Sequence, residues 1–337
     1  MRLTVRFAVL LTITIFLTLF GFPAYFHGRY PHSAGPGFDK GVSRLYQREI
    51  EQAQPAIVLL GDSILTKGVD VMAFQEQLGL PTYKLDIPGS SSALWYLVIK
   101  SNIVEAEPAP RGLVIVFRDT LLTAPTFRTT GPYFGLIDKF ANPDDSLLMK
   151  RAYLAQLSPM QRTLEMFFPL YTYRADVRDA MDGGLRHALP GLFGCDAACA
   201  NDSMISALGD VQPAIFAASI LQAEQILYTP GQLDFPAQID KSFLPEIIRL
   251  AQKRGIQLVF VRAPTNIFPD PADEPAGLKQ YMADLNAYLA EQNIPMFDLS
   301  RINGIGPAQF SDPHHMTLEG KAIFTSVLAE TLKSYIR

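Results

Sequence analysis

A serine near the start of the chain and an aspartate–histidine pair near its end are residue types that can perform nucleophilic catalysis together. Ser63 follows a run of five apolar residues, and Asp312 and His315 stand three positions apart in a short segment near the C-terminus. A serine hydroxyl becomes a nucleophile when a histidine takes its proton and a carboxylate orients that histidine. The chemistry would be acyl transfer through a serine ester, provided that the fold brings the two ends of the chain together.

The residues around Ser63 predict a buried strand that runs into a sharp turn. Residues 56–60 are all apolar, which favours a strand covered on both faces, and Gly61 gives the backbone the freedom to turn. Open α/β sheets bind ligands at the carboxyl edge of their strands. A serine at that edge can begin the next helix, where free backbone N–H groups favour a developing negative charge. Serine is also an ordinary helix N-cap residue, so this segment alone does not establish catalysis.

Motifs at both ends of the chain together resemble the SGNH, or GDSL, hydrolase superfamily. The segment 61–65, Gly-Asp-Ser-Ile-Leu, is similar to the nucleophile block of that superfamily. Asp312-x-x-His315, followed by Gly320, is similar to its terminal acid–base block. The order and separation of the two blocks also agree with the superfamily. The resemblance implies a triad of Ser63, His315 and Asp312 that needs no organic cofactor and no metal.

The resemblance also separates the triad from its polar neighbours. The spacing from Asp312 selects His315, rather than the adjacent His314, as the base. Asp62 belongs to the motif as well, but its expected role is local hydrogen bonding that shapes the turn around Ser63. Asp312 is therefore the expected triad acid.

The second and third blocks of the superfamily form its oxyanion hole, and this chain matches them in part. Gly89 matches the glycine of the second block, so the backbone N–H groups of Gly89 and Ser63 are the implied donors. The third block normally reads Gly-x-Asn-Asp, whereas residues 116–119 are Val-Phe-Arg-Asp. Two alternatives remain for Arg118. Its guanidinium donates to the oxyanion, or it pairs with Asp119 and leaves the hole with two donors.

Strands and helices alternate along much of the chain, which predicts an α/β fold. The predicted strands are 56–60, 83–87, 113–117, 256–261 and 295–299. The predicted helices are 42–53, 69–78, 95–104, 241–253, with Gly255 as its C-cap, 277–292, and an amphipathic C-terminal helix. This alternation indicates a mainly parallel sheet with helices on both faces. The resemblance, which covers roughly 56–117 and 241–337, likewise implies a three-layer α/β/α sandwich of the SGNH, flavodoxin-like type.

The alternation is interrupted over about 121–240, which we interpret as a large, mainly helical insertion over the active-site edge. Its predicted helices are 147–168 and 214–227. Inserted elements beside a catalytic edge often form a lid, a substrate groove or a partner surface. Most of the aromatic residues in this segment are expected to form its own core.

Composition indicates one globular body behind the N-terminal segment. Hydrophobic residues make up 48% of the 337 positions and charged residues 18%, which allows a large core and argues against disorder. The net charge of −4 gives no basic field, so no nucleic-acid partner is expected. We expect the two cysteines, Cys195 and Cys199, to form a disulfide. Free thiols, or a metal site that recruits His187, are the alternatives.

The residues at the N-terminus predict an export signal that is not cleaved. Arg2 and Arg6 precede an uncharged apolar run at 7–26, which is about the length that crosses a bilayer as a helix. The arginines favour a cytoplasmic N-terminus and an exported body. A cleaved signal peptide is the competing interpretation, but no clear Ala-x-Ala site is present. We therefore expect a transmembrane anchor in the inner or plasma membrane at 1–27, a tether at 28–41, and a periplasmic or extracytoplasmic catalytic domain at 42–337.

This layout of anchor, exported SGNH-like body and large insertion resembles the periplasmic subunits that act with membrane-bound O-acyltransferases. The resemblance implies a serine esterase or O-acyltransferase that moves or removes an acyl group, expected to be acetyl, on a cell-envelope polysaccharide. A membrane-bound O-acyltransferase is then the expected partner. One alternative is a stand-alone envelope esterase or lipase-like hydrolase. The other is a non-catalytic assembly or scaffold protein with the same fold. The triad is the same for hydrolysis and transfer, so it does not choose between water and a sugar hydroxyl as acceptor.

Overall fold

The structure is a computed structural model that describes residues 2–25, 33–38, 40–168, 171 and 224–335. The chain divides into two compact units. The first unit is formed by Met1–Pro36 and Leu154–Glu224, and the second by Gly37–Tyr153 and Gln225–Arg337. All of the residues proposed above for catalysis and for the oxyanion hole belong to the second unit.

The second unit is built on a five-stranded sheet in the order β2-β1-β3-β4-β5, in which every neighbouring pair is parallel. The strands are β1 (Ile57–Gly61), β2 (Thr82–Asp86), β3 (Gly112–Phe117), β4 (Gln257–Arg262) and β5 (Met296–Asp298). Every residue of β1 and β3 is buried, as expected for apolar strands covered on both faces. The sequence predicted all five strands to within a few residues of these bounds.

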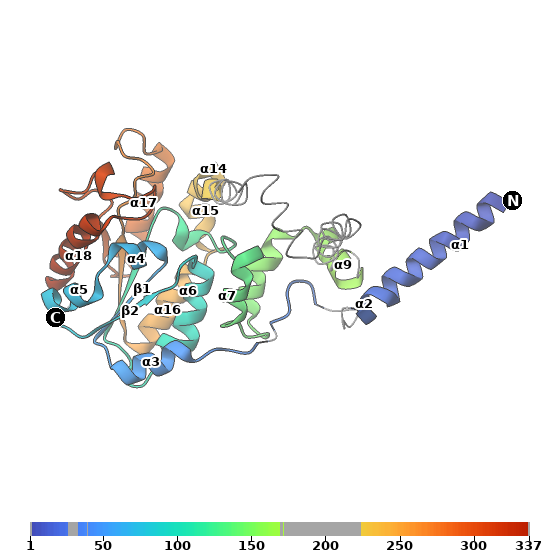
Figure 1. Ribbon diagram of the computed structural model, residues 1–337, viewed down its shortest axis with the longest axis horizontal. Coiled ribbons are helices and arrows are strands. Elements are labelled where there is room, and N and C mark those ends of the chain that lie inside the picture. The colour runs from blue at the N-terminus through green and yellow to red at the C-terminus, as the bar shows by residue number, and fades with distance from the viewer. Residues whose placement is uncertain (1, 26–32, 39, 169–170, 172–223, 336–337) are drawn as a thin grey trace, which may run out of the picture. The chain divides into compact units, whose positions relative to one another are not determined.

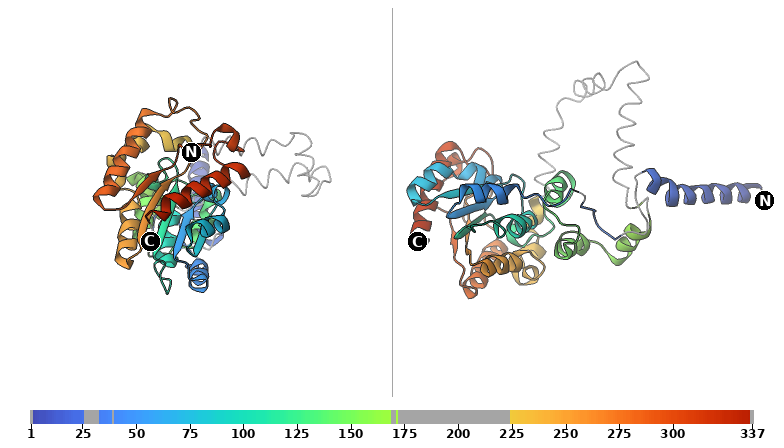
Figure 2. Two further views of the ribbon diagram at one scale, coloured as in Figure 1. Left: turned by 90° about the vertical axis from the view of Figure 1, so that its left-hand side faces the viewer. Right: turned by 90° about the horizontal axis from the view of Figure 1, so that it is seen from below.

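Two hydrophobic clusters cover the two faces of the sheet, because side chains alternate along each strand. Val58 and Leu60 pack in one cluster with the helices α3 (Leu45–Ala53), α6 (Ser92–Val98), α16 (Leu244–Arg254) and α17 (Ala276–Glu291). Ile57 and Leu59 pack in the other with α4 (Ser63–Gly68), α5 (Val71–Leu78) and α18 (Leu318–Lys333). Figures 1 and 2 show the sheet between these two helical layers. The predicted α/β/α layering is confirmed.

Short elements complete the second unit. Its remaining α-helices are α7 (Phe134–Asp138), α8 (Ser146–Leu148), α14 (Pro230–Leu233) and α15 (Phe235–Ile239). Its π-helices are η2 (Ile99–Ile103) and η5 (Met149–Tyr153), and its 3-10 helices are η3 (Leu121–Thr123), η4 (Gly131–Tyr133), η7 (Gln225–Tyr228) and η8 (Pro307–Gln309). The predicted helix at 95–104 therefore changes from α to π after Val98. Gly255, at φ +72°, is the C-cap of α16 as predicted.

Part of the segment interpreted as an insertion packs into the same core as the helices beside the sheet. Leu122, Phe127, Tyr153 and Phe235 are buried in the hydrophobic cluster that contains α6 and α16. The predicted helix at 147–168 is divided among α8, η5, η6 (Leu154–Gln156) and α9 (Pro159–Phe167). Cys195, Cys199, His187 and most of the predicted helix at 214–227 lie outside the described residues.

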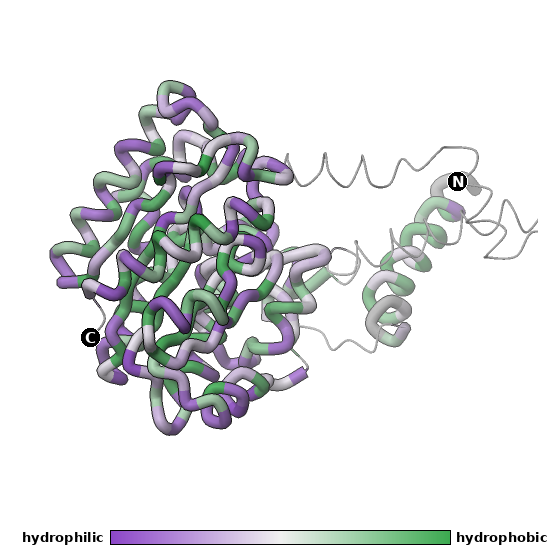
Figure 3. The backbone as a smooth tube through the Cα atoms, turned by 60° about the vertical axis from the view of Figure 1, so that its left-hand side comes forward, coloured by the Kyte–Doolittle hydropathy of each residue, from purple (hydrophilic) through white to green (hydrophobic). Residues whose placement is uncertain are grey.

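The N-terminal unit begins with a helical segment whose apolar side chains are exposed. α1 (Arg2–Phe16), a π-helix η1 (Leu17–Gly21) and α2 (Phe22–Tyr25) follow one another directly. Phe7, Leu10 and Phe16 are each more than 60% exposed, and Figure 3 colours most of this segment as hydrophobic. Within the described ranges, no helix combines the length and the apolar character needed to span a membrane.

Candidate active site

Ser63 is the first residue of α4, directly after the carboxyl end of β1. Asp62 is the N-cap, and its Oδ1 accepts a hydrogen bond of 3.0 Å from the Ile64 amide, so the expected local role of Asp62 is confirmed. Gly61 is required at this turn, since a Cβ there would lie 2.9 Å from the Leu65 Cβ and 3.0 Å from the Val116 carbonyl oxygen. The turn therefore presents Ser63 at the sheet edge where α/β proteins bind ligands.

The fold brings Ser63, His315 and Asp312 together, although 252 positions separate the serine from the histidine. His315 Nε2 lies 2.9 Å from Ser63 Oγ, and His315 Nδ1 lies 2.8 Å from Asp312 Oδ2. Both distances are those of hydrogen bonds. The imidazole is thus held between a hydroxyl that it can deprotonate and a carboxylate that fixes the Nδ1–H tautomer.

Asp312 also organises the loop that carries His315. Its Oδ1 accepts hydrogen bonds from the amides of His314, at 2.9 Å, and His315, at 3.0 Å. Partial burial raises the pKa of the Asp312 carboxyl, but these two amides and the His315 imidazole outweigh burial and leave the pKa below its ordinary value. The carboxylate is therefore charged throughout the neutral range.

The Asp–His loop is anchored at both ends. An antiparallel β-bridge between Phe310 and Met316 closes its turn, and the Asn266 amide donates a hydrogen bond of 2.8 Å to the Pro313 carbonyl. A Cβ on Gly320 would lie 2.5 Å from the Gln309 carbonyl oxygen, so only glycine permits this approach of α18 to the loop. The glycine of the terminal motif is thereby explained by close packing.

Two backbone amides stand beside the nucleophile. The Ser63 amide is at the N-terminus of α4, and Gly89, at φ +78°, lies in the turn after β2. Neither amide donates a hydrogen bond to any other residue that the structure describes. The turn after β1 and the turn after β2 are joined by two hydrogen bonds to the Gly61 carbonyl. The Ile87 amide donates one, at 3.0 Å, and the Ser90 hydroxyl donates the other, at 3.3 Å. Such a pair of donors is suited to hold an oxyanion.

Arg118 is buried and paired with its neighbour. Only 2% of its side chain is exposed, and Arg118 Nη1 lies 3.3 Å from Asp119 Oδ2. The same Asp119 oxygen accepts a 2.6 Å hydrogen bond from the Tyr228 hydroxyl. Of the two alternatives for Arg118, this geometry favours pairing with Asp119.

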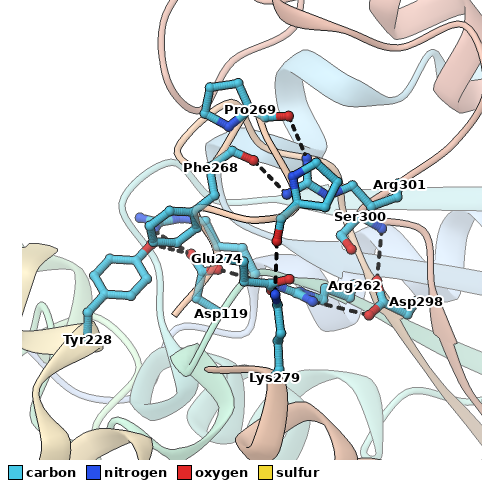
Figure 4. A network of polar contacts seen from close by, with 12 residues as sticks. Asp119, Tyr228, Arg262, Phe268, Pro269, Glu274, Lys279, Asp298, Ser300 and Arg301 are labelled. Carbon is cyan, nitrogen blue, oxygen red and sulfur yellow. Dashed lines mark hydrogen bonds and ion pairs between the residues drawn. The ribbon is translucent and has the colours of Figure 1, made fainter. Parts of the chain in front are cut away.

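Sequence reasoning missed the charged network that surrounds Asp119 (Figure 4). Arg262, at the end of β4, lies 3.1 Å from Asp298 Oδ2, donates to Glu274, and lies 3.9 Å from Asp119 Oδ1. Burial lowers the pKa of Arg262, but the carboxylates of Asp298 and Glu274 outweigh burial and raise the pKa above its ordinary value. The signal was present, since Asp119, Arg262 and Asp298 each stand within two residues of the end of a predicted parallel strand.

We expect Arg118→Ala to affect stability more than rate. Removing one partner of a buried ion pair typically costs about 3–5 kcal/mol, and the Tyr228 and Arg262 contacts of Asp119 place the expected loss toward the lower figure. Asp119→Asn should destabilise the protein in the same direction. Denaturant unfolding and ester hydrolysis measured on both variants check this. A well-folded Arg118→Ala protein whose kcat falls about 100- to 1,000-fold at unchanged KM would instead assign the guanidinium to the oxyanion.

In the part of the chain that the structure describes, no group of three or more His, Cys, Asp or Glu side chains is arranged to hold a metal ion. The carboxylates of the network around Arg262 contact guanidinium groups instead. The hydrogen-bonded hydroxyl, imidazole and carboxylate of Ser63, His315 and Asp312 are suited to nucleophilic and acid–base chemistry.

Comparisons with known proteins found a partial family-model match and several similar solved structures. A protein-family model matches residues 231–337, which is less than half of the chain. No curated protein matches the chain. Three similar solved structures are a Bacteroides fragilis NCTC 9343 protein provisionally described as an acylhydrolase (14% identity, TM-score 0.39, 83% of this chain and 88% of that one), a GDSL-like lipase from Bacteroides thetaiotaomicron VPI-5482 (11%, 0.39, 82% and 87%), and the acetyl xylan esterase AlAXEase (12%, 0.35, 83% and 99%).

These identities and scores are too low to carry an activity across. The class of protein rests instead on the chain's own features: an α/β protein with a parallel five-stranded sheet and a hydrogen-bonded Ser63, His315 and Asp312 at the carboxyl edge of that sheet.

Proposed function

We propose that this chain is an SGNH-type serine esterase or O-acyltransferase. The observation that carries the proposal is the hydrogen-bonded order of Ser63 Oγ, His315 Nε2, His315 Nδ1 and Asp312 Oδ2, with distances of 2.9 and 2.8 Å. A weaker support is the similarity of its sequence motifs to the superfamily. The geometry also argues against a purely structural scaffold, because packing alone does not require a hydroxyl, an imidazole and a carboxylate in this order.

The reaction proceeds in two steps. His315 takes the Ser63 proton as Oγ attacks the ester carbonyl, and the Ser63 and Gly89 amides donate to the resulting oxyanion. His315 then gives the proton to the departing alkoxide, which leaves an acyl group on Ser63. In the second step His315 deprotonates an acceptor hydroxyl, which attacks the acyl-serine and restores the free serine. No organic cofactor takes part.

The acceptor decides whether the protein hydrolyses or transfers. Water gives an esterase, and a sugar hydroxyl gives an O-acyltransferase. We propose a cell-envelope polysaccharide as the glycan substrate, acetyl as the acyl group, and a membrane-bound O-acyltransferase as the partner. The support is the layout of the sequence, with an apolar N-terminal segment before the SGNH-like body.

Membrane attachment through residues 7–26, with a cytoplasmic N-terminus and an exported body, is part of the same proposal. Its support is the apolar run after Arg2 and Arg6 and the exposure of the apolar side chains on α1. Fractionation of cells that express the full chain should place it in the membrane pellet, with the body accessible to protease only from outside the cytoplasmic membrane. Recovery of a shortened, soluble exported chain would identify a cleaved signal instead.

Mass analysis tests the catalytic proposal directly. The full chain is incubated with p-nitrophenyl acetate, quenched in acid and digested. We expect one acetyl group on the peptide that contains Ser63. Acetylation confined to surface lysines, with none on that peptide, would refute the covalent mechanism.

A further inference from the structure

A short segment of the interpreted insertion, residues 127–133, contacts the turn that carries Ser63 and the turn that carries Gly89. Arg128 Nη1 lies 3.7 Å from Asp62 Oδ2, so the guanidinium is paired with the residue that precedes the nucleophile. Both side chains are largely buried, with 12% of Arg128 and 4% of Asp62 exposed. The Asp62 carboxylate therefore joins the start of α4, through Oδ1, to Arg128, through Oδ2.

The same segment places an aromatic ring over the oxyanion turn. A Cβ on Gly89 would lie 2.7 Å from Tyr133 Cε1 and 3.1 Å from Tyr133 Cδ1, so the phenol ring lies directly against this glycine. The ring also contacts Arg128, whose guanidinium lies 5.3 Å from the centre of the Tyr133 ring and 4.9 Å from that of Phe127. Tyr133 is partly exposed, so a substrate can reach it.

The order of the sheet decides which part of an ester would meet Tyr133. Gly89 follows β2, Ser63 follows β1, and Asn266, whose amide holds the His315 loop at Pro313, follows β4. In the order β2-β1-β3-β4, the Gly89 turn and the anchor of the histidine loop thus lie on opposite sides of Ser63. The departing alcohol must lie on the histidine side, because His315 protonates it. The acyl chain is bonded to the carbonyl carbon on the side away from that alcohol, which directs it toward Gly89 and Tyr133.

We propose that Tyr133, positioned by Arg128, forms the wall of the acyl site and restricts this enzyme to short acyl groups. An oxyanion held by the Gly89 amide lies about 3 Å from that nitrogen, so the first carbons of the acyl chain share the space beside Gly89 with the phenol ring. An acetyl group ends before it meets the ring, whereas a longer chain must displace the ring or bend away from it. Tyr133 is a specificity-determining residue, and Arg128 is a positioning residue. This inference rests on the proposed function.

The test is the acyl-chain profile of hydrolysis by the full chain, measured as kcat/KM for p-nitrophenyl acetate, butanoate and hexanoate. The parent protein should prefer acetate. Tyr133→Ala should raise the ratio of hexanoate to acetate by about tenfold or more, the scale on which single methylene groups are discriminated in a pocket. Tyr133→Phe is the matched control, because it keeps the ring and should keep the parent profile. Arg128→Gln should shift the ratio in the same direction as Tyr133→Ala by releasing the ring.

The outcomes separate this inference from the function on which it rests. A parent protein that is neither acylated on Ser63 nor able to hydrolyse any of the esters overturns both. An active parent with the same chain-length ratio in folded Tyr133→Ala overturns the inference alone. So does a Tyr133→Ala protein whose preference changes with the alcohol of the ester and not with its acyl chain. If Tyr133→Ala does not fold, Tyr133→Leu gives the same comparison with more of the side-chain volume kept.

Discussion

Ser63→Ala is expected to lower kcat by roughly 10⁶-fold, the scale seen when the nucleophile of a serine triad is removed. The loss is this large because Ser63 Oγ forms the covalent bond, and among the described residues no other hydroxyl donates a hydrogen bond to the His315 imidazole. The fold should be almost unaffected. Ser63 is partly exposed at the start of α4, and within the described part of the chain its hydroxyl makes one hydrogen bond, to His315, worth about 0.5–1.5 kcal/mol.

Steady-state ester hydrolysis and denaturant unfolding, measured on the same preparation, check this expectation. Ser334→Ala is the matched control, because Ser334 is an exposed serine next to the end of α18, and among the described residues its hydroxyl bonds only to the Thr331 carbonyl. It should hydrolyse esters like the parent. A Ser63→Ala protein that kept activity comparable to the parent would place the nucleophile elsewhere.

Asp312→Asn is expected to lower kcat by about 10⁴-fold, with little change in KM. The amide oxygen of asparagine can still accept the backbone hydrogen bonds of His314 and His315, so the loop should keep its shape. The amide nitrogen, however, faces His315 Nδ1 as a donor and favours the tautomer that places the proton on Nε2. That tautomer cannot take the Ser63 proton. Equal activity in the variant and the parent would show that Asp312 is not the triad acid.

The lowered pKa of Asp312 also predicts how stability depends on pH. Because the pKa is lower in the folded protein than in the unfolded chain, the carboxylate stabilises the fold at every pH above its unfolded pKa, about 3.9. That contribution is lost as the pH falls through the lower, folded value. Unfolding measured from pH 7 to pH 2 should therefore show a smaller acid destabilisation in Asp312→Asn than in the parent. An identical pH dependence would mean that the carboxylate does not prefer the folded state.

Local residue patterns were sufficient to predict the parts of this protein that depend on neighbours in sequence. The run at 56–60 predicts a buried strand, because a short uninterrupted apolar run that ends at a turn residue is typical of a strand covered on both faces. Gly255 predicts a helix end through its backbone freedom. Asp312 and His315 could be chosen as partners because their spacing resembles the terminal acid–base block of the superfamily, and one turn of loop brings side chains three positions apart into contact.

Tertiary structure alone decided which distant side chains meet. The sequence near Arg118 did not indicate whether its guanidinium would reach the oxyanion or pair with Asp119. In the structure both side chains are buried together, and the Tyr228 hydroxyl donates to the same Asp119 oxygen, which favours the pair. The contact of Tyr133 with Gly89 brings the short helix η4 against the turn after β2, and the two are more than 40 positions apart in the sequence. Such contacts leave no periodic signal, because they are set by how the layers pack and not by the conformational preferences of the residues themselves. The sequence by itself therefore determined the triad candidates and the sheet, and packing determined the surroundings of the triad.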